Sequence, residues 1–260
     1  MPGRVMRRWF AVAGALVALL LLPGAKPSVF NPNALWKIVH EQCVPNQQQH
    51  GDPKPCAEVD LKDGVDRGYA VLKDLNGPTQ YLLIPTARIV GIESPELQTP
   101  GGTNYFAAAW DERRLVEKTL GHELPRDNVG LAVNSVLSRS QTQLHIHIDC
   151  MLPDVRDTLA RLRSSIGDTW AALSEPLGGH PYWAMRVMGS TLDGHNPFKL
   201  LADGIPRARA NMKWRTLVVV GMQFDGDAPG FALLTDRVNP LLFDIAAGAR
   251  LEDHTCGAAH

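Results

Sequence analysis

The chain has 260 residues, of which 45% are hydrophobic and 20% are charged, and its formal net charge at neutral pH is −1. This composition is ordinary for a globular protein and excludes a disordered chain, and a chain of this length buries a substantial core. Proteins that bind nucleic acid are usually basic, so the near-neutral charge argues against that class of partner.

The first 25 residues predict a signal anchor. Three arginines precede an apolar run from Trp9 to Pro23, which falls between the core of a signal peptide and a full membrane span of about 20 residues. Pro23-Gly24-Ala25 is a poor cleavage signal, because proline stands where a small residue is needed, so we favour an uncleaved anchor. Positive charge stays on the cytoplasmic side, so we expect residues 26–34 to form a tether and the rest to be exported.

Export bears on the four cysteines, because an even number of cysteines in an oxidising compartment predicts disulfides. Cys43 and Cys56 flank a loop rich in Pro, Gln and Gly that a bridge would close, so we pair them and leave Cys150 with Cys256. The second bridge would hold the C-terminus beside the strand that carries Cys150. A metal cluster is the competing interpretation, and no C-x-x-C spacing supports it.

The segments that follow predict an α+β fold. In chain order we expect a helix at 35–42 before a loop at Cys43, a hairpin of strands at 68–74 and 80–85, a helix at 104–120 that stops at Gly121, and strands at 129–135 and 143–150. The second half predicts a helix at 154–164, a strand at 182–187, helical segments at 197–203 and 206–213, and strands at 216–224 and 231–237. The second half can therefore repeat the plan of the first, although the sequences of the halves differ too much to require it.

The stretch from His145 to Asp149 is the strongest indication of a functional site. Side chains alternate along a strand, so His145, His147 and Asp149 point to one face while Ile146 and Ile148 point into a core. Clustered titratable groups mark sites more often than they mark structure, and we favour a histidine nucleophile that attacks phosphorus. The alternatives are a metal site, which needs further ligands from elsewhere, and polar surface residues on a half-buried strand.

Two upstream residues make the pattern specific. Asn134 lies seven residues before Gln141, and Gln141 lies four residues before His145. This spacing resembles the histidine-triad superfamily of nucleotide hydrolases and transferases, whose strand carries H-x-H-x-H with the middle histidine as the nucleophile. The segment 73–85 is similar to the D-[IL]-x-P-x-x-x-L-x-I-P hairpin of that superfamily, so we expect its antiparallel sheet with helices.

A closer resemblance is to the CDP-diacylglycerol pyrophosphatases, which are membrane-anchored members of that superfamily. The segments that carry it are 35–39, 45–49, 72–85, 93–95, 134–135, 141–150, 153–156, 182–187 and 253–256. The resemblance implies a catalytic domain at 35–260 that uses water to hydrolyse CDP-diacylglycerol to CMP and phosphatidate through a covalent nucleotidyl-histidine. It also implies a single-pass protein of the cell inner membrane, with the catalytic domain on the periplasmic side and no metal or other cofactor.

The resemblance also implies roles for the residues of the strand. In the register favoured by Asn134 and Gln141, His147 is the nucleophile and His145 is its partner. Asp149 then occupies the third position, where the superfamily usually has His or Gln, and would hold an imidazole in its useful tautomer. The alternative register takes residues 143, 145 and 147 as the three positions and makes His145 the nucleophile.

The remaining expected contacts are to substrate. Asn134 and Gln141 would contact phosphate or ribose, and Arg186 is expected to clamp phosphate from the family-like segment 182–187. Three other functions stay open: a hydrolase or transferase for soluble nucleotide conjugates, an exported metal-binding protein that uses His145, His147 and Asp149, and a non-catalytic lipid-binding module.

Overall fold

The structure is a computed structural model that describes residues 31–257. The predicted anchor at 1–25 lies outside the described residues. Within 31–257 no helix combines the length and the apolar character needed to cross a membrane.

One ten-stranded antiparallel sheet runs through the described fold, in the order β1-β2-β3-β5-β4-β8-β9-β7-β6, with β10 paired to the end of β5. In chain order the strands are β1 (Glu58–Asp60), β2 (Tyr69–Lys73), β3 (Tyr81–Pro85), β4 (Val129–Val133), β5 (Ile146–Met151), β6 (Ala171–Ala172), β7 (Trp183–Met188), β8 (Leu217–Gln223), β9 (Pro229–Thr235) and β10 (Glu252–Asp253). The predicted antiparallel sheet of an α+β fold is therefore confirmed.

The arrangement of strands repeats within the sheet. A hairpin (β2–β3), helical segments and a second hairpin (β4–β5) are followed by a hairpin (β6–β7), a helix and another hairpin (β8–β9). The two sets join edge to edge through the pairing of β4 with β8. The strand orders on the two sides of that pair mirror each other.

Six α-helices accompany the strands in the described part of the chain. They are α1 (Ala34–Ile38), α2 (Val44–His50), α3 (Tyr105–Glu112), α4 (Arg114–Leu120), α5 (Pro153–Leu162) and α6 (Pro197–Gly204). A π-helical turn, Val39–Cys43, joins α1 to α2, and short 3-10 turns lie at 95–97, 126–128, 163–165, 209–214, 225–227, 240–242 and 248–251.

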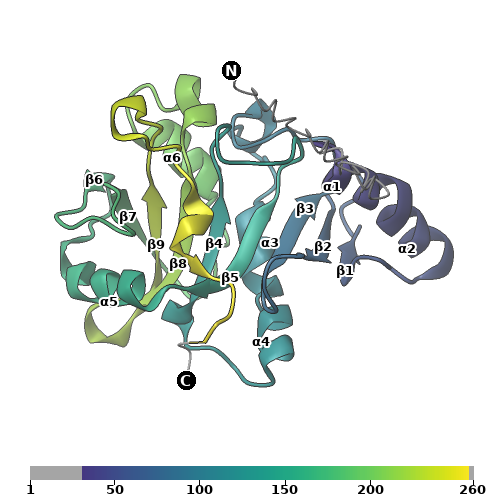
Figure 1. The fold of residues 1–260 in the computed structure, drawn as a ribbon, viewed down its shortest axis with the longest axis horizontal. Coiled ribbons are helices and arrows are strands. Elements are labelled where there is room, and N and C mark those ends of the chain that lie inside the picture. The colour runs from purple at the N-terminus through teal and green to yellow at the C-terminus, as the bar shows by residue number, and fades with distance from the viewer. Residues whose placement is uncertain (1–30, 258–260) are drawn as a thin grey trace, which may run out of the picture. The chain divides into compact units, whose positions relative to one another are not determined.

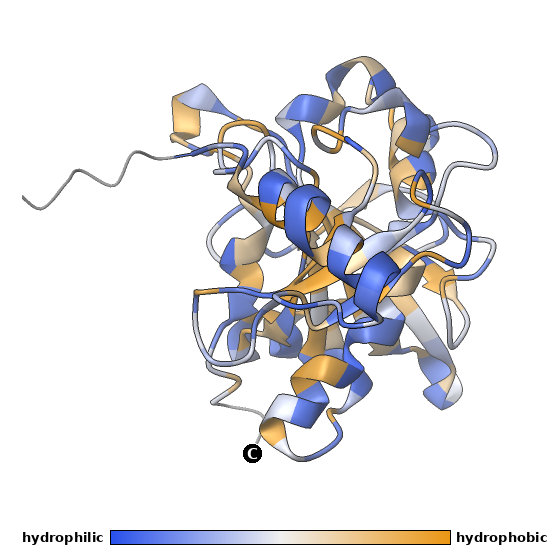
Figure 2. Cartoon of the chain, turned by 90° about the vertical axis from the view of Figure 1, so that its right-hand side faces the viewer, coloured by the Kyte–Doolittle hydropathy of each residue, from blue (hydrophilic) through white to orange (hydrophobic). Residues whose placement is uncertain are grey.

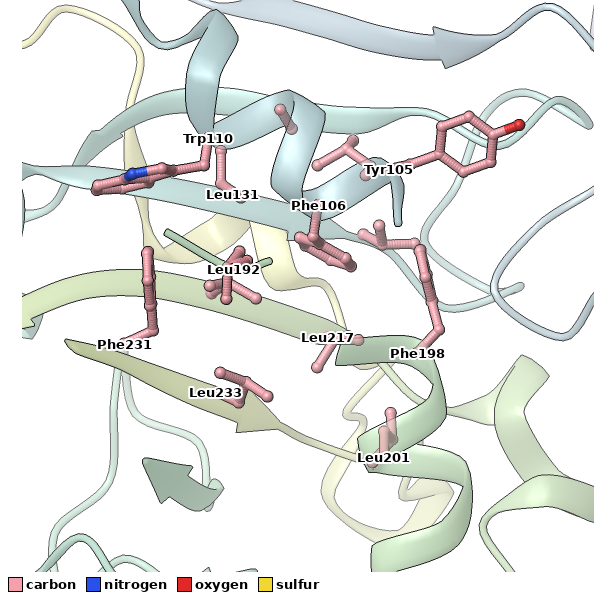
Figure 3. Packing of buried hydrophobic residues seen from close by; sticks show 14 of the residues in the cluster. Tyr105, Phe106, Trp110, Leu131, Leu192, Phe198, Leu201, Leu217, Phe231 and Leu233 are labelled. Carbon is pink, nitrogen blue, oxygen red and sulfur yellow. The ribbon is translucent and has the colours of Figure 1, made fainter. Parts of the chain in front are cut away.

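One face of the sheet is covered by α3 and α6, which form the main core with it (Figure 3). Phe106 on α3 stacks at a tilt on Phe198 of α6, with ring centroids 4.9 Å apart. Trp110 meets Phe231 of β9 edge to face at the same centroid distance, a favourable geometry for aromatic rings. A Cβ at position 221 would come within 2.4 Å of the Trp110 ring, so Gly221 lets the indole lie close to β8. This core therefore buries one whole face of the central strands.

The opposite face is covered at its two ends and faces the viewer in Figure 1. The continuous helix α1–α2 packs over β2 and β3 through Val39, Cys43 and Val44, and its hydrophilic side faces outward in Figure 2. Helix α5 packs over the other half through Val155 and Leu159. Between these two covers, every residue of β4 and β5 is buried.

Three predicted helical segments differ in the structure. The helix expected at 35–42 continues to His50, because Val39 and Cys43 bury their side chains on the sheet and the π-helical turn carries the chain past Pro45. The helix expected at 104–120 is divided at Arg113, where i to i+3 hydrogen bonds tighten the backbone, and it stops at Gly121 as predicted, in a left-handed conformation. The segment at 206–213 forms a 3-10 helix, Arg209–Trp214.

Candidate active site

Two imidazoles lie side by side at the start of β5. His147 is on β5, and His145 directly precedes that strand. Their rings are 5.0 Å apart, edge to face, and both are nearly buried. Neighbouring strands set this position, because His147 pairs with Leu82 on one side and Ala132 on the other. The predicted alternation is confirmed, since Ile146 and Ile148 pack into the main core on the other face.

The backbone fixes the tautomer of His145. Its Nδ1 lies 2.8 Å from the carbonyl oxygen of Gln143, which can only accept a hydrogen bond. Nδ1 therefore carries the proton, and Nε2 keeps the lone pair. The Gln143 side chain is itself held, because its amide donates to the carbonyls of Pro85 and Ala87. His145 is thus oriented as a base or a nucleophile that acts through Nε2.

His147 faces a different partner. Its Nε2 lies 3.4 Å from the amide nitrogen of Asn134, while the amide oxygen of Asn134 accepts a hydrogen bond from the backbone N–H of Ala249. That second bond turns the Asn134 amide so that its NH₂ group points toward His147. The Nδ1 atom of His147 is buried and has no hydrogen-bond partner within the described residues. Asn134 therefore orients His147. The contact of Asn134 with phosphate or ribose stays a prediction.

Both imidazoles are held neutral. Burial lowers the pKa of His145 and lowers that of His147 well below 6.5, and a proton on the neighbouring His254 lowers the pKa of His147 further. A neutral imidazole is the form that can attack phosphorus or accept a proton. The pair is therefore in its reactive protonation state at neutral pH.

The histidines open into a cavity of about 430 Å³, a size at which proteins bind small molecules. Helix α1, the turn between β2 and β3 and the loop between β4 and β5 surround it. Its lining residues are Ala34, Leu35, Ile38, Pro55, Leu72, Lys73, Asp74, Leu75, Asn76, Leu82, Ser140, Gln141, His145 and His147. Its lining combines apolar side chains, among them Leu35, Ile38 and Leu75, with the polar side chains of Lys73, Asp74, Asn76 and the two histidines. A larger cavity of about 740 Å³ lies beside α6, and its lining contains no histidine.

Asp149 is hydrogen-bonded to an imidazole, but that imidazole belongs to His254 and not to the pair on β5. Nδ1 of His254 donates to Asp149 Oδ2 at 2.9 Å, and this hydrogen bond raises the pKa of His254. The other carboxylate oxygen accepts from the hydroxyl of Thr79 at 2.8 Å and from the N–H of Cys150 at 2.9 Å. These partners occupy the fully buried Asp149 carboxylate, so it does not act on the β5 histidine pair directly.

A second buried carboxyl group, that of Glu252, lies near Asp149 and His254. Burial raises the pKa of Glu252 well above its usual range, and the Asp149 carboxylate adds to the effect. The Gln80 amide nitrogen lies 3.4 Å from Glu252 Oε2 and 3.0 Å from His254 Nδ1. Sequence reasoning missed Thr79, Gln80, Glu252 and His254. The predicted pairing of Cys150 with Cys256 was the available signal, since it brings residues 149 and 254 close together.

Two other predicted substrate contacts have different partners. Both polar atoms of the Gln141 side chain bind the segment that leads into α1: Oε1 accepts from the Leu35 N–H, and Nε2 donates to the Asn31 carbonyl. Gln141 lines the cavity but mainly holds that segment. Arg186 is not brought to the histidines, because β7 lies four strands from β5, roughly 19 Å away at the usual strand spacing. Its guanidinium binds Asp168 at 2.6 Å.

Both predicted disulfides are present, Cys43–Cys56 and Cys150–Cys256. The second one ties the C-terminal segment that contains His254 to the end of β5. The predicted metal ligands His145, His147 and Asp149 do not form a three-residue site. The reason is that the Asp149 carboxylate turns toward Thr79 and His254. The sulfur atoms near Asp149 belong to the disulfide and are therefore not thiolate ligands.

A neutral histidine pair on an antiparallel sheet, lining a cavity and lying near a buried carboxylate and a third imidazole, is the arrangement of a candidate active site. Comparison with known proteins identifies the family. The sequence model described as CDP-diacylglycerol pyrophosphatase matches residues 30–260. A CDP-diacylglycerol pyrophosphatase of Yersinia pestis is 41% identical over 243 residues, which cover 93% of this chain and 91% of that protein. The chain therefore belongs to the CDP-diacylglycerol pyrophosphatase family and is a hydrolase.

Proposed function

We propose that this protein hydrolyses the pyrophosphate bond of CDP-diacylglycerol to CMP and phosphatidate in phospholipid metabolism. The observation that carries the proposal is the neutral pair His145 and His147, which lines a cavity in a chain of this family. Apolar residues of that lining, Leu35, Ile38 and Leu75, favour a lipid substrate over a soluble nucleotide conjugate.

The proposed reaction has two steps. A neutral imidazole attacks the phosphorus next to cytidine, a P–N bond forms, and the bond to the bridging oxygen breaks with its electron pair leaving on phosphatidate. Water then attacks the same phosphorus, the P–N bond breaks, and CMP is released. A phosphate monoester is a good leaving group, so the first step needs alignment and charge stabilisation more than a strong acid.

The hydrogen bonds support His145 as the attacking residue, which is the alternative register. Its Nδ1–H donates to the Gln143 carbonyl, so Nε2 holds the lone pair and the carbonyl stabilises the positive charge that develops on the ring. His147, with Asn134 against its Nε2, is then the partner that meets the leaving oxygen or the attacking water. We further propose that the first half of the sheet is a histidine-triad-like unit and that the second half is its relative, whose strand β9 contains no histidine.

We also propose the cellular setting that the sequence predicts. The segment 1–25 would anchor the protein in the inner membrane, with residues 35–260 on the periplasmic side. The two disulfides are consistent with an oxidising compartment. A diacyl substrate stays in the bilayer, so an anchored enzyme meets it at a high effective concentration.

The test is incubation with labelled CDP-diacylglycerol in detergent and chelator, followed by trapping of an acid-labile adduct on wild type, His145→Ala and His147→Ala. We expect His145→Ala to abolish the adduct and His147→Ala to retain it. The opposite result would assign the attack to His147, and an adduct that survives in both variants would refute the covalent histidine. Loss of wild-type activity in chelator would instead support the metal hypothesis. A kcat/KM for a soluble nucleotide sugar equal to that for the lipid would contradict the proposed substrate.

A further inference from the structure

A turn close to the histidine site presents large apolar side chains to solvent. Leu241 is 90% exposed, Leu242 61% and Phe243 94%. They form the tip of the turn 239–244, which we call the apolar turn. Figure 1 shows it in yellow at the upper edge of the drawing, beyond β8 and β9. Adjacent large apolar residues at such exposure mark an interaction surface more often than chance.

The base of the apolar turn is firmly held. Asn239 and Asp244 pair through two backbone hydrogen bonds of 2.9 and 3.0 Å, and the Asn239 side chain accepts from the Leu241 N–H. The buried Asp244 carboxylate binds His180 and Arg250. A turn fixed at its base in this way does not fold its tip back onto the core, so the three apolar side chains are displayed rather than buried.

The apolar turn is connected directly to the active site. The Ser135 hydroxyl donates to the carbonyl of Ile245, and the Ser135 N–H donates to that of Ala246. Ser135 follows Asn134, which contacts His147. Leu137, in the same loop between β4 and β5, is also more than half exposed. The residues that follow the apolar turn are therefore hydrogen-bonded to the loop that contains Leu137 and borders the cavity.

The segment that would come from the membrane reaches the fold at this loop. The Asn31 carbonyl accepts from the Gln141 side chain, and the Pro32 carbonyl accepts from the N–H of Thr142 at 2.7 Å. Asn31 is where the described chain begins, and the predicted anchor precedes it. The attachment point of the anchor and the apolar turn thus flank the same loop.

The charges around the apolar turn suit an anionic surface. Arg237 and Lys213 are exposed beside it, and the backbone of Lys213 binds that of Val136 in the β4–β5 loop. The acidic residues of this segment, Asp236 and Asp244, are buried, and Glu93, whose carboxylate interacts with Lys213, is half-buried in an ion pair with Arg139. Cations that flank an apolar tip are typical of segments that insert between anionic lipids.

From these observations we infer that the apolar turn docks on the lipid bilayer, with Leu241, Leu242 and Phe243 inserted and Lys213 and Arg237 against anionic headgroups. Docking would turn the cavity toward the membrane, so that a nucleotide headgroup reaches His145 while its acyl chains stay in lipid. The benefit to catalysis rests on the proposed lipid substrate, whereas the docking does not. A second copy of the chain fits less well, because three protruding side chains supply far less than the roughly 800 Å² per partner of a stable interface.

The first test places a fluorescent label in full-length protein in phosphatidylglycerol-containing vesicles. Phe243→Cys carries an environment-sensitive dye, and Met188→Cys, at the opposite end of the sheet and 43% exposed, is the matched control. The four native cysteines are buried in disulfides, so the added thiol is the one labelled. We expect a blue shift and quenching by lipid-borne nitroxides at position 243 only. A label at 243 that stays in water, or that becomes buried in vesicle-free protein as its concentration rises, would overturn the inference.

The second test measures hydrolysis with Leu241→Ser, Leu242→Ser and Phe243→Ser combined. We expect kcat/KM on CDP-diacylglycerol in bilayers to fall at least about tenfold, because each side chain buries enough apolar surface for a change of roughly that size. Activity on a monomeric short-chain analogue should not change, and Met188→Ser should affect neither substrate. An equal fall on both substrates would contradict docking. If wild type hydrolyses neither substrate, the proposed function is wrong. The fluorescence of the label at position 243 still shows whether the apolar turn enters the bilayer.

Discussion

The Cys150–Cys256 disulfide is expected to stabilise the fold more than Cys43–Cys56 does. The bridges span sequence separations of 106 and 13 residues. In the chain-entropy model a bridge stabilises by restricting the unfolded chain, and these loop lengths correspond to about 5 and about 3 kcal/mol at 25 °C. All four cysteines are buried, so the packing lost in a Cys→Ala pair is similar for the two bridges and largely cancels in the comparison.

The assay is urea unfolding of the two double alanine variants without reductant, followed by tryptophan fluorescence. We expect the variant that lacks Cys150–Cys256 to lose about 2 kcal/mol more of the free energy of unfolding. An equal or smaller loss would refute the entropic reasoning, because it would mean that the tail is held by its other contacts. Those contacts are the two-residue strand β10 and the Asp149–His254 pair.

The variant without Cys150–Cys256 also tests whether His254 contributes to the reaction apart from its effect on stability. Without the Cys150–Cys256 bridge fewer contacts hold the segment with His254 against β5, so kcat/KM should fall under conditions where the sheet is still folded. His254→Gln keeps the bridge and removes only the titratable ring, and it should lower kcat/KM with little loss of stability, since the ring is partly exposed. Full activity in both variants would show that the Asp149–His254 pair is not used in the reaction.

Three further predictions concern single groups. Arg186→Ala should leave kcat/KM within about twofold, because its guanidinium binds Asp168 away from the cavity; a tenfold loss would place it in the reaction. Burial raises the pKa of Asp236 to about 7, so the folded state keeps a proton that the unfolded state loses, and stability falls as pH rises from about 4 to 7. Asp236→Asn should therefore stabilise the protein by about 1 kcal/mol at pH 8 in urea unfolding, and no gain would contradict the burial argument. The low pKa of His147 predicts a pH profile of kcat/KM that stays flat from pH 7 to 6, whereas a loss with a midpoint near 6.5 would indicate a solvated imidazole.

The catalytic strand could be predicted from sequence because its signal is local. Alternating residues on a strand share a face whatever the strand pairs with, so the common orientation of His145 and His147 followed from their spacing. The disulfides were predictable for a related reason, since four cysteines and one short loop leave few pairings. The tautomer of His145 was not predictable, because it depends on the position of the Gln143 carbonyl at the start of β5.

Other features depend on the order of strands in space, which local patterns do not contain. Arg186 lies in a segment that resembles the family, yet β9, β8 and β4 separate its strand from β5. The helix that begins at Ala34 extends beyond its predicted end, because Val39 and Cys43 bury their side chains on the sheet. This tertiary packing outweighs the effect of the proline at position 45. His254 stands alone in the sequence and gains a partner only through the disulfide next to it.

The pairing of Asp149 with His254 also bears on how the site accepts an anionic substrate. A lone buried carboxylate beside the histidine pair would repel a pyrophosphate and would raise the pKa of the neighbouring imidazoles. Here the carboxylate accepts from Thr79 and from a backbone N–H, and the raised pKa of His254 favours a compensating positive charge. The positive charge on His254 also helps to lower the pKa of His147, opposite to the effect that a lone carboxylate would have. The partners of Asp149 therefore offset its negative charge, while burial keeps the imidazoles that line the cavity neutral.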